Sequence, residues 1–232
     1  MSNEKPKDSE EELLTAEELY KTGKMPTMMS HWYSIRKKYP EEFLIAYRMG
    51  DFYEFFYQDA INVSRLLGLT LTKRGKGRSR HHLAGIPHQA KQHFKALVKQ
   101  GETVVIVEQL EDPSTAKKAS RIVKRGVVRV LSPGTVVDNN LLDSGESNFI
   151  CSIVKERSNY GVAFIDVSSG EFYTLSLTGD DALMGVWSYV SRYRPVECVL
   201  SEKLVKNHGF MSSLRENSSI VIKEHPSYQF EF

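Results

Sequence analysis

Apolar and polar positions follow two periods along the first half of the chain, one helical and one strand-like. Met28, Trp32 and Ile35 share one face of a helix that we expect to begin after Pro26 and to end by Pro40. The other periodic segments are INVSRLLG and AKQHFKALVKQG as helices, and EFLIAYRMG, LTLT, TVVIVEQL and VVRVLSPGT as strands. This alternation predicts a mixed sheet covered by helices.

The pattern changes after residues 138–148, a polar, turn-rich stretch that we interpret as a linker. The runs FICSIVKE, YGVAFIDVSS and EFYTLSL follow one another closely and predict a meander of two hairpins. A helix from Asp180 to Tyr193, the strand ECVLS, a second helical stretch and the strand SSIVIKEH come next. Three antiparallel strands followed by α/β units are the layout of a ribonuclease H-like fold.

These patterns predict an α/β protein with two domains, for which 232 residues are sufficient. Residues 1–24 are rich in Glu and Lys, so we expect a disordered leader in which only Glu11 to Tyr20 has a helical pattern. Residues 25–138 make up the predicted mixed-sheet domain. Residues 139–232 make up the predicted ribonuclease H-like domain.

Composition narrows the class of protein. The sequence contains no run of eighteen apolar residues, and its first residues are polar and acidic, so we expect neither a membrane span nor a secretory signal. Cys151 and Cys198 lie inside apolar strand-like runs without the spacing of a metal site. We therefore interpret both as buried, reduced thiols and expect a cytoplasmic protein.

The formal net charge is only +2, but the basic residues are clustered. The segment KRGKGRSR contributes Lys73, Arg74, Lys76, Arg78 and Arg80, and Lys117 to Arg129 holds six more basic residues without an acid. Such stretches can follow a phosphate backbone, and they can equally be solvated surface. Charge alone leaves both interpretations open.

The segment YRMGDFYEFFY carries the strongest functional signal. Gly50 allows the backbone an unusual turn, so Phe52 and Glu54 could project from one side while Tyr53 points to the other. An exposed Phe beside a basic surface suits a minor-groove wedge, which unstacks base pairs at lower cost where pairing is already defective. From the residues alone, core packing is the preferred interpretation of Phe52, and a helix-start carboxylate that of Glu54.

Five motifs occur in a single order: TMMSHWYSIRKKYPEEFLIAYRMGDFYEFFYQDA, LTLTKRG, AGIPHQA, VEQLEDPSTAK and VKRGVVRVLSPGTVVD. Together they resemble the N-terminal part of the MutS family of DNA mismatch repair proteins, and YGVAFIDVSSGEF is similar to the start of that family's connector domain. The resemblance runs from Pro26 to the C-terminus and implies a mismatch-recognition domain followed by a connector domain.

The family's Phe-X-Glu recognition motif falls on Phe52, Tyr53 and Glu54, with Gly50 and Asp51 as supporting residues. The resemblance implies double-stranded DNA with mismatches or small insertion/deletion loops as the ligand. It also implies that Phe52 stacks on the affected base from the minor groove and that Glu54 hydrogen-bonds to it. Among phosphates a carboxylate is repelled, so Glu54 should weaken binding to intact duplex.

The sequence offers little support for an enzymatic function or a metal site in this chain. Asp166 follows the strand YGVAFI as the first carboxylate of a ribonuclease H-like site does, but Glu171 and Glu197 complete no convincing two-metal constellation. His81, His82, His88 and His93 fit no common zinc spacing, so solvated or DNA-facing histidines are expected. The sequence contains no Walker A motif. We therefore predict no catalytic residue, no metal site and no cofactor in this chain.

Complete members of the family are much longer and end in an ATPase that also forms the dimer. The resemblance therefore implies that ATP, Mg²⁺ and dimerisation belong to a longer parent, and that the connector is truncated here. A MutL-type repair protein is an expected partner through the connector. The alternative is a structural interaction domain that no longer reads DNA. Retention of Phe52 and Glu54 argues against it, and against a recombination paralogue.

Overall fold

The computed structural model describes residues 13–118, 121–136, 148–218 and 220–230. Contacts divide the chain into two compact units, Met1–Val130 and Leu131–Phe232. The division lies slightly before the boundary predicted at residue 138, and most of the predicted linker lies outside the described residues. The segment after Val130 packs within the second unit, because the Gly134 N–H donates to Glu197 Oε2 at 3.0 Å.

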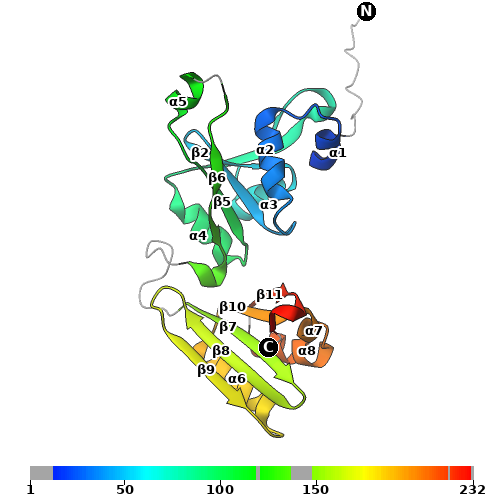
Figure 1. Cartoon of the computed structure of the whole chain (residues 1–232), viewed down its shortest axis with the longest axis vertical. Coiled ribbons are helices and arrows are strands. Elements are labelled where there is room, and N and C mark those ends of the chain that lie inside the picture. The colour runs from blue at the N-terminus through cyan, green and yellow to red at the C-terminus, as the bar shows by residue number, and fades with distance from the viewer. Residues whose placement is uncertain (1–12, 119–120, 137–147, 219, 231–232) are drawn as a thin grey trace, which may run out of the picture. The chain divides into compact units, whose positions relative to one another are not determined.

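The first unit is a six-stranded mixed sheet in the order β3-β4-β2-β1-β5-β6, which confirms the predicted class (Figure 1). Strands β1 and β5 are parallel, whereas β1–β2, β2–β4 and β3–β4 pair antiparallel. The elements are α1 (Ala16–Lys21), α2 (Thr27–Arg36), β1 (Leu44–Met49), β2 (Phe52–Phe56), α3 (Tyr57–Leu67), β3 (Thr72–Arg74), η1 (Gly77–Ser79), β4 (His81–Pro87), α4 (Lys91–Lys99), β5 (Val104–Gln109), α5 (Pro113–Lys118) and β6 (Arg125–Leu131).

Helices cover both faces of this sheet. On one face, Trp32 of α2 packs in a core with Tyr47 of β1 and Phe56 of β2. Residues that alternate with these point to the other face, where the Tyr53 ring meets Phe94 of α4 edge-on at 5.0 Å. Burial on both faces explains why the central strands consist almost entirely of apolar residues.

The described part of the predicted leader contains a helix, which overlaps the helical pattern noted over Glu11 to Tyr20. Residues Ala16–Lys21 form α1, and Thr15 and Glu18 close a capping box at its start. Leu19 is buried in the same core as α2, so a short amphipathic turn is stabilised by burial although its surroundings are rich in charge. The remainder of the leader, residues 1–12, lies outside the described residues.

Strand β2 was not predicted as a strand, and two further strands differ from the prediction. The run LTLT was expected as a strand, but strand pairing begins only at Thr72 and continues into the basic segment. No strand was predicted over His81–Pro87, which forms β4 and includes the first residues of the motif AGIPHQA. Gly and Pro weaken strand propensity, and β4 forms because it pairs with β2 on one side and β3 on the other.

The second unit is a five-stranded sheet in the order β11-β10-β7-β8-β9, with α6 against β8 and β9 (Figure 1). Strands β7, β8 and β9 form the predicted antiparallel meander, and β10 and β11 add parallel strands. The elements are η2 (Pro133–Thr135), β7 (Phe149–Glu156), β8 (Asn159–Asp166), β9 (Phe172–Leu177), α6 (Ala182–Tyr193), β10 (Glu197–Ser201), α7 (Glu202–Val205), α8 (His208–Asn217), β11 (Val221–His225) and η3 (Ser227–Phe230).

The two cysteines are neighbours in this sheet. Cys151 of β7 and Cys198 of β10 are register partners, and both are buried and free. The interpretation of both as buried thiols is therefore confirmed. Among the described residues, no helix is long and apolar enough to cross a membrane.

Candidate nucleic-acid interface

The candidate site is built on the hairpin that joins β1 to β2. Gly50 adopts φ 58°, in the left-handed region that a turn of this kind needs. Arg48 and Tyr53 are register partners, as are Met49 and Phe52, so the strands pair up to the turn itself. The His88 N–H donates to the Asp51 carbonyl at 2.8 Å and ties the turn to the end of β4. The hairpin is therefore held at its tip as well as along its strands.

Phe52, Tyr53 and Glu54 alternate across β2 as predicted. Phe52 is 48% exposed, whereas Tyr53 is only 7% exposed and packs into the sheet. The core interpretation of Phe52 is therefore wrong. Phe52 pairs with Pro87, and Gly85 lies opposite Glu54 with no side chain to fill the space between the two. An aromatic ring and a carboxylate thus stand side by side on one face.

Tyr53 anchors the hairpin from the opposite face. Its hydroxyl donates to Glu108 Oε1 of β5, and Arg48 Nη1 lies 3.8 Å from the other oxygen of that carboxylate. Burial and the hydrogen bond to Glu108 raise the pKa of Tyr53 to about 12, while Arg48 opposes this shift. The anchor holds the register that presents Phe52, and no local pattern in the sequence identifies Glu108 as its partner.

Glu54 is a half-buried carboxylate in a strand, so the helix-start interpretation is wrong. Arg74 Nη1 of β3 lies 3.5 Å from Glu54 Oε2, and this oxygen has no hydrogen-bond partner among the described residues. Burial raises the pKa of Glu54, and the positive charges of Arg74 and Arg125 oppose that rise. Glu54 Oε2 is therefore a buried oxygen whose hydrogen-bonding capacity is unused in the described residues.

Arg125 belongs to this site although the sequence did not single it out. Its Nε donates to the Arg48 carbonyl at 2.8 Å, and its guanidinium lies 5.3 Å from the centre of the Tyr47 ring. The Tyr47 hydroxyl is 2.8 Å from Nδ1 of His31 in α2. Only the pairing of distant strands and a helix brings these groups together, so no local sequence signal could have found them.

The five predicted backbone-contact residues are all exposed, on β3 and the loop that follows it. Strand β4 lies between this edge of the sheet and β2. The later basic stretch is different, because Arg121 binds the Glu111 carboxylate with both guanidinium nitrogens and Arg125 is held against β1. The edge at β3 therefore offers charge to phosphate, whereas part of the later stretch is structural.

The histidines do not form a metal site. His81 is buried and stacks on Tyr57 at 5.0 Å, which contradicts its expected position in solvent or on DNA. His88 and His93 lie beside the carbonyls of Asp51 and Ala90. Within the described ranges, no group of three or more His, Cys, Asp or Glu side chains could hold a metal ion.

Asp166 serves the turn between β8 and β9. Its Oδ1 accepts from the Ser168 and Ser169 N–H groups and from the Ser168 hydroxyl, and its Oδ2 accepts from Asn148 N–H at 2.9 Å. Burial raises the pKa of Asp166, but these hydrogen bonds outweigh it and hold the pKa below its usual range. Both oxygens are thus occupied, which argues against a nuclease carboxylate.

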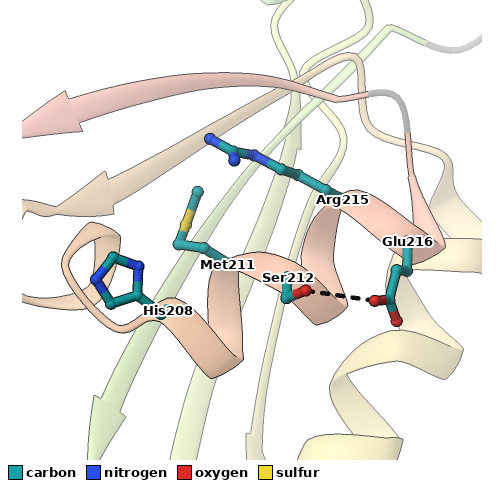
Figure 2. Close-up of a pocket in the computed structure, with 5 residues that line it drawn as sticks. All are labelled: His208, Met211, Ser212, Arg215 and Glu216. Atoms are coloured by element: carbon teal, nitrogen blue, oxygen red, sulfur yellow. Dashed lines mark hydrogen bonds between the residues drawn. The ribbon is translucent and has the colours of Figure 1, made fainter.

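A shallow pocket lies on α8. Figure 2 shows that its five lining residues come from this one helix, and its volume is about 430 Å³. The Ser212 hydroxyl donates to Glu216 Oε1 at 3.3 Å. The residues are His208, Met211, Ser212, Arg215 and Glu216. A surface with both charge signs offers phosphate no consistent attraction.

Comparison with known proteins covers both units. The MutS domain I model matches residues 26–140, and the MutS domain II model matches residues 148–232. DNA mismatch repair protein MutS of Methanosarcina acetivorans is 37% identical over 210 residues, which span 84% of this chain and 23% of that protein. The Methanococcoides burtonii protein of the same name is 39% identical over 201 residues, or 85% of this chain and 22% of its own length.

A bacterial relative shows the same relation. DNA mismatch repair protein MutS of Streptococcus pneumoniae strain G54 is 44% identical over 156 residues, covering 66% of this chain and 18% of that protein. The chain thus spans about a fifth of the length of the curated relatives that it matches.

Proposed function

Since the chain belongs to the MutS family, we propose that it binds duplex DNA carrying mispaired or unpaired bases, and that it acts by recognition rather than catalysis. The exposure of Phe52 beside Glu54, at the tip of a firmly anchored hairpin, is the observation that carries this proposal. A ring that costs little to desolvate can enter a base step from the minor groove.

Selectivity follows from the cost of opening the base stack. An apolar wedge must unstack base pairs, which costs a few kcal/mol in intact duplex and less where a base is mispaired or unpaired. Glu54 then accepts or donates a hydrogen bond at the exposed base. Backbone attraction from Lys73, Arg74, Lys76, Arg78 and Arg80 adds affinity without sequence preference.

We extend the proposal to the longer MutS proteins only in outline. We assign three functions to a longer MutS protein. They are ATP and Mg²⁺ chemistry, dimerisation, and docking of a MutL-type protein on the second unit. A cytoplasmic location stays a prediction.

The test is fluorescence anisotropy of this chain with three labelled duplexes at low salt: matched, G·T-mismatched and with a single-base insertion. We expect tighter binding to the two defective duplexes. Phe52→Ala should remove most of this preference, because stacking of a base on an aromatic side chain contributes roughly 1–3 kcal/mol. Phe172→Ala is the matched control, since Phe172 is another exposed Phe but lies in the second unit.

Equal loss of preference in both variants, or no change in Phe52→Ala, would count against the wedge. A folded wild-type chain that binds all three duplexes equally would favour the alternative, a structural interaction domain without mismatch reading.

A further inference from the structure

Arg74 is the basic residue of the β3 edge that reaches Glu54. The strands β3 and β2 are both paired to β4, with Arg74 opposite His81 and Glu54 opposite Gly85. The Arg74 side chain extends across β4 and places Nη1 3.5 Å from Glu54 Oε2. The Arg74 side chain is 55% exposed and that of Glu54 only 17%, so the guanidinium faces the carboxylate and solvent at once.

This ion pair is loosely made. A separation of 3.5 Å lies at the outer limit for a hydrogen bond, and Glu54 Oε2 has no hydrogen-bond partner among the described residues. A backbone phosphate offers the planar guanidinium two oxygens in a matching fork, which is stronger than one distant contact. When DNA binds at the β3 edge, a phosphate can therefore replace Glu54 as the partner of Arg74.

Arg125 cannot be withdrawn in the same way. Its Nε donates to the Arg48 carbonyl at 2.8 Å and its Nη1 donates to the Val123 carbonyl at 3.0 Å. Its guanidinium also lies over the Tyr47 ring. Arg74 and Arg125 both act on Glu54. Arg125 is fixed in the fold, whereas Arg74 is exposed and can change its partner.

Burial favours the uncharged form of three other titratable groups that face this region. Burial raises the pKa of Tyr47 on β1, and it lowers the pKa values of His31 on α2 and His81 on β4. The charge balance at Glu54 therefore depends on Arg74 and Arg125.

We propose that Arg74 determines how strongly Glu54 rejects intact duplex, by exchanging the Glu54 carboxylate for a DNA phosphate on binding. This inference rests on the proposed function. Once Arg74 binds phosphate, Glu54 is left as a half-buried anion against the minor groove. A paired base offers this anion no free hydrogen, whereas a mispaired or unpaired base does. Arg74 thus connects the backbone contact to the reading of the base.

The experiment measures the ratio of Kd for matched duplex to Kd for single-base-insertion duplex, using the whole chain at low salt. The variants are Arg74→Ala, Glu54→Gln, both together, and Lys73→Ala as a control that removes a neighbouring charge on the same strand. We expect Arg74→Ala to lower the ratio by about three- to tenfold in the wild-type background. Without the opposing charge of Arg74, burial favours the protonated form of Glu54, which does not repel intact duplex. In the Glu54→Gln background the same substitution should weaken binding to both duplexes equally and leave the ratio of Kd values unchanged.

Lys73→Ala should weaken binding to the matched and the insertion duplex by the same factor, in the wild-type and in the Glu54→Gln background. The proposal is overturned if Arg74→Ala behaves like Lys73→Ala, because Arg74 is then a plain phosphate contact. It is also overturned if the ratio falls equally with and without Glu54. Neither result contradicts the proposed function, as long as the wild-type chain binds the insertion duplex more tightly than the matched duplex and the Phe52→Ala variant does not. Loss of that preference in the wild-type chain would overturn both.

Discussion

At Tyr53, one hydroxyl joins the β1–β2 hairpin to strand β5 through Glu108. We expect Tyr53→Phe to lower the free energy of unfolding by about 1–2 kcal/mol, because it leaves the Glu108 carboxylate without this donor. The pKa of Tyr53 is raised to about 12 in the folded state, against 10.0 ordinarily. Its contribution is thus complete below pH 10 and is lost as the pH rises through about 12.

Urea unfolding at several pH values measures this effect. The stability difference between wild type and Tyr53→Phe should be largest near neutral pH and should narrow at alkaline pH. Tyr228→Phe is the control, since Tyr228 is 70% exposed. A loss that equals that of Tyr228→Phe, or one that does not change with pH, would show that the hydroxyl contributes nothing specific.

The thiols of Cys151 and Cys198 should be unreactive in the folded chain. Their mutual hydrogen bond and burial raise the pKa of Cys198 well above its usual range, and only the thiolate attacks a thiol reagent. We expect modification by a chromogenic disulfide reagent to be at least about a hundredfold slower in the native chain than in urea. Rapid native labelling would indicate that β7 and β10 open locally.

At the scale of single residues, the period of two along β2 was enough to predict that Phe52 and Glu54 share a face. It could not predict their exposure, since an aromatic after a strand is more often buried. The core that α2 covers includes Tyr47 and Phe56 but not Phe52, and it forms through contacts between segments that are distant in sequence.

At the scale of elements, the β8–β9 turn depends on one carboxylate. Asp166 accepts hydrogen bonds from three backbone N–H groups and one hydroxyl, so we expect Asp166→Ala to cost about 2–4 kcal/mol of unfolding free energy. Its folded pKa lies below the ordinary 3.8. This stability is therefore present above about pH 4 and is lost as the pH falls through the folded pKa.

Thermal or urea unfolding of Asp166→Ala between acid and neutral pH checks this prediction. The exposed Asp180→Ala provides the comparison, since it removes a carboxylate from the same unit without a described cap. If Asp166→Ala is no less stable than Asp180→Ala at neutral pH, the carboxylate does not organise the turn, and a functional role for it would have to be reconsidered.

The elements that the sequence predicted well are those with long, regular periodicity. Helices α2, α4 and α6 and the meander β7–β9 follow from side-chain patterns within each segment. Strand β4 was missed because Gly85 and Pro87 obscure its pattern, and it exists through its two neighbours. The same pairing brings β3 to the edge and places the basic segment on the far side of β4 from the recognition strand.

At the scale of the whole molecule, each unit contains its own core and one tryptophan. Trp32 is buried in the first unit, and Trp187 packs against the core of the second. We expect Leu200→Ala to lower the unfolding midpoint reported by Trp187 and to leave that reported by Trp32 unchanged. Leu97→Ala should have the reverse effect, because each removal of a fully buried Leu costs about 2–5 kcal/mol within its own core.

Fluorescence-detected urea unfolding of single-tryptophan chains, Trp32→Phe and Trp187→Phe, separates the two reports. Both Leu variants are made in each background. If either Leu variant shifts both reporters by the same amount, the chain unfolds as one cooperative unit and the two cores are not independent.

The sequence by itself determined the fold class, the order of most elements and the resemblance to MutS domains, because each of these depends on periodicity or on motifs within short segments. It also indicated that Phe52 and Glu54 project from one side, but not that they belong to a strand. Only the tertiary structure decided which groups surround Glu54. Arg74 and Arg125 arrive on β3 and β6, at opposite edges of the sheet order, and their approach depends on strand pairing over long sequence separations. Burial and charge at a site are sums over such neighbours, so they cannot be calculated from the motif alone.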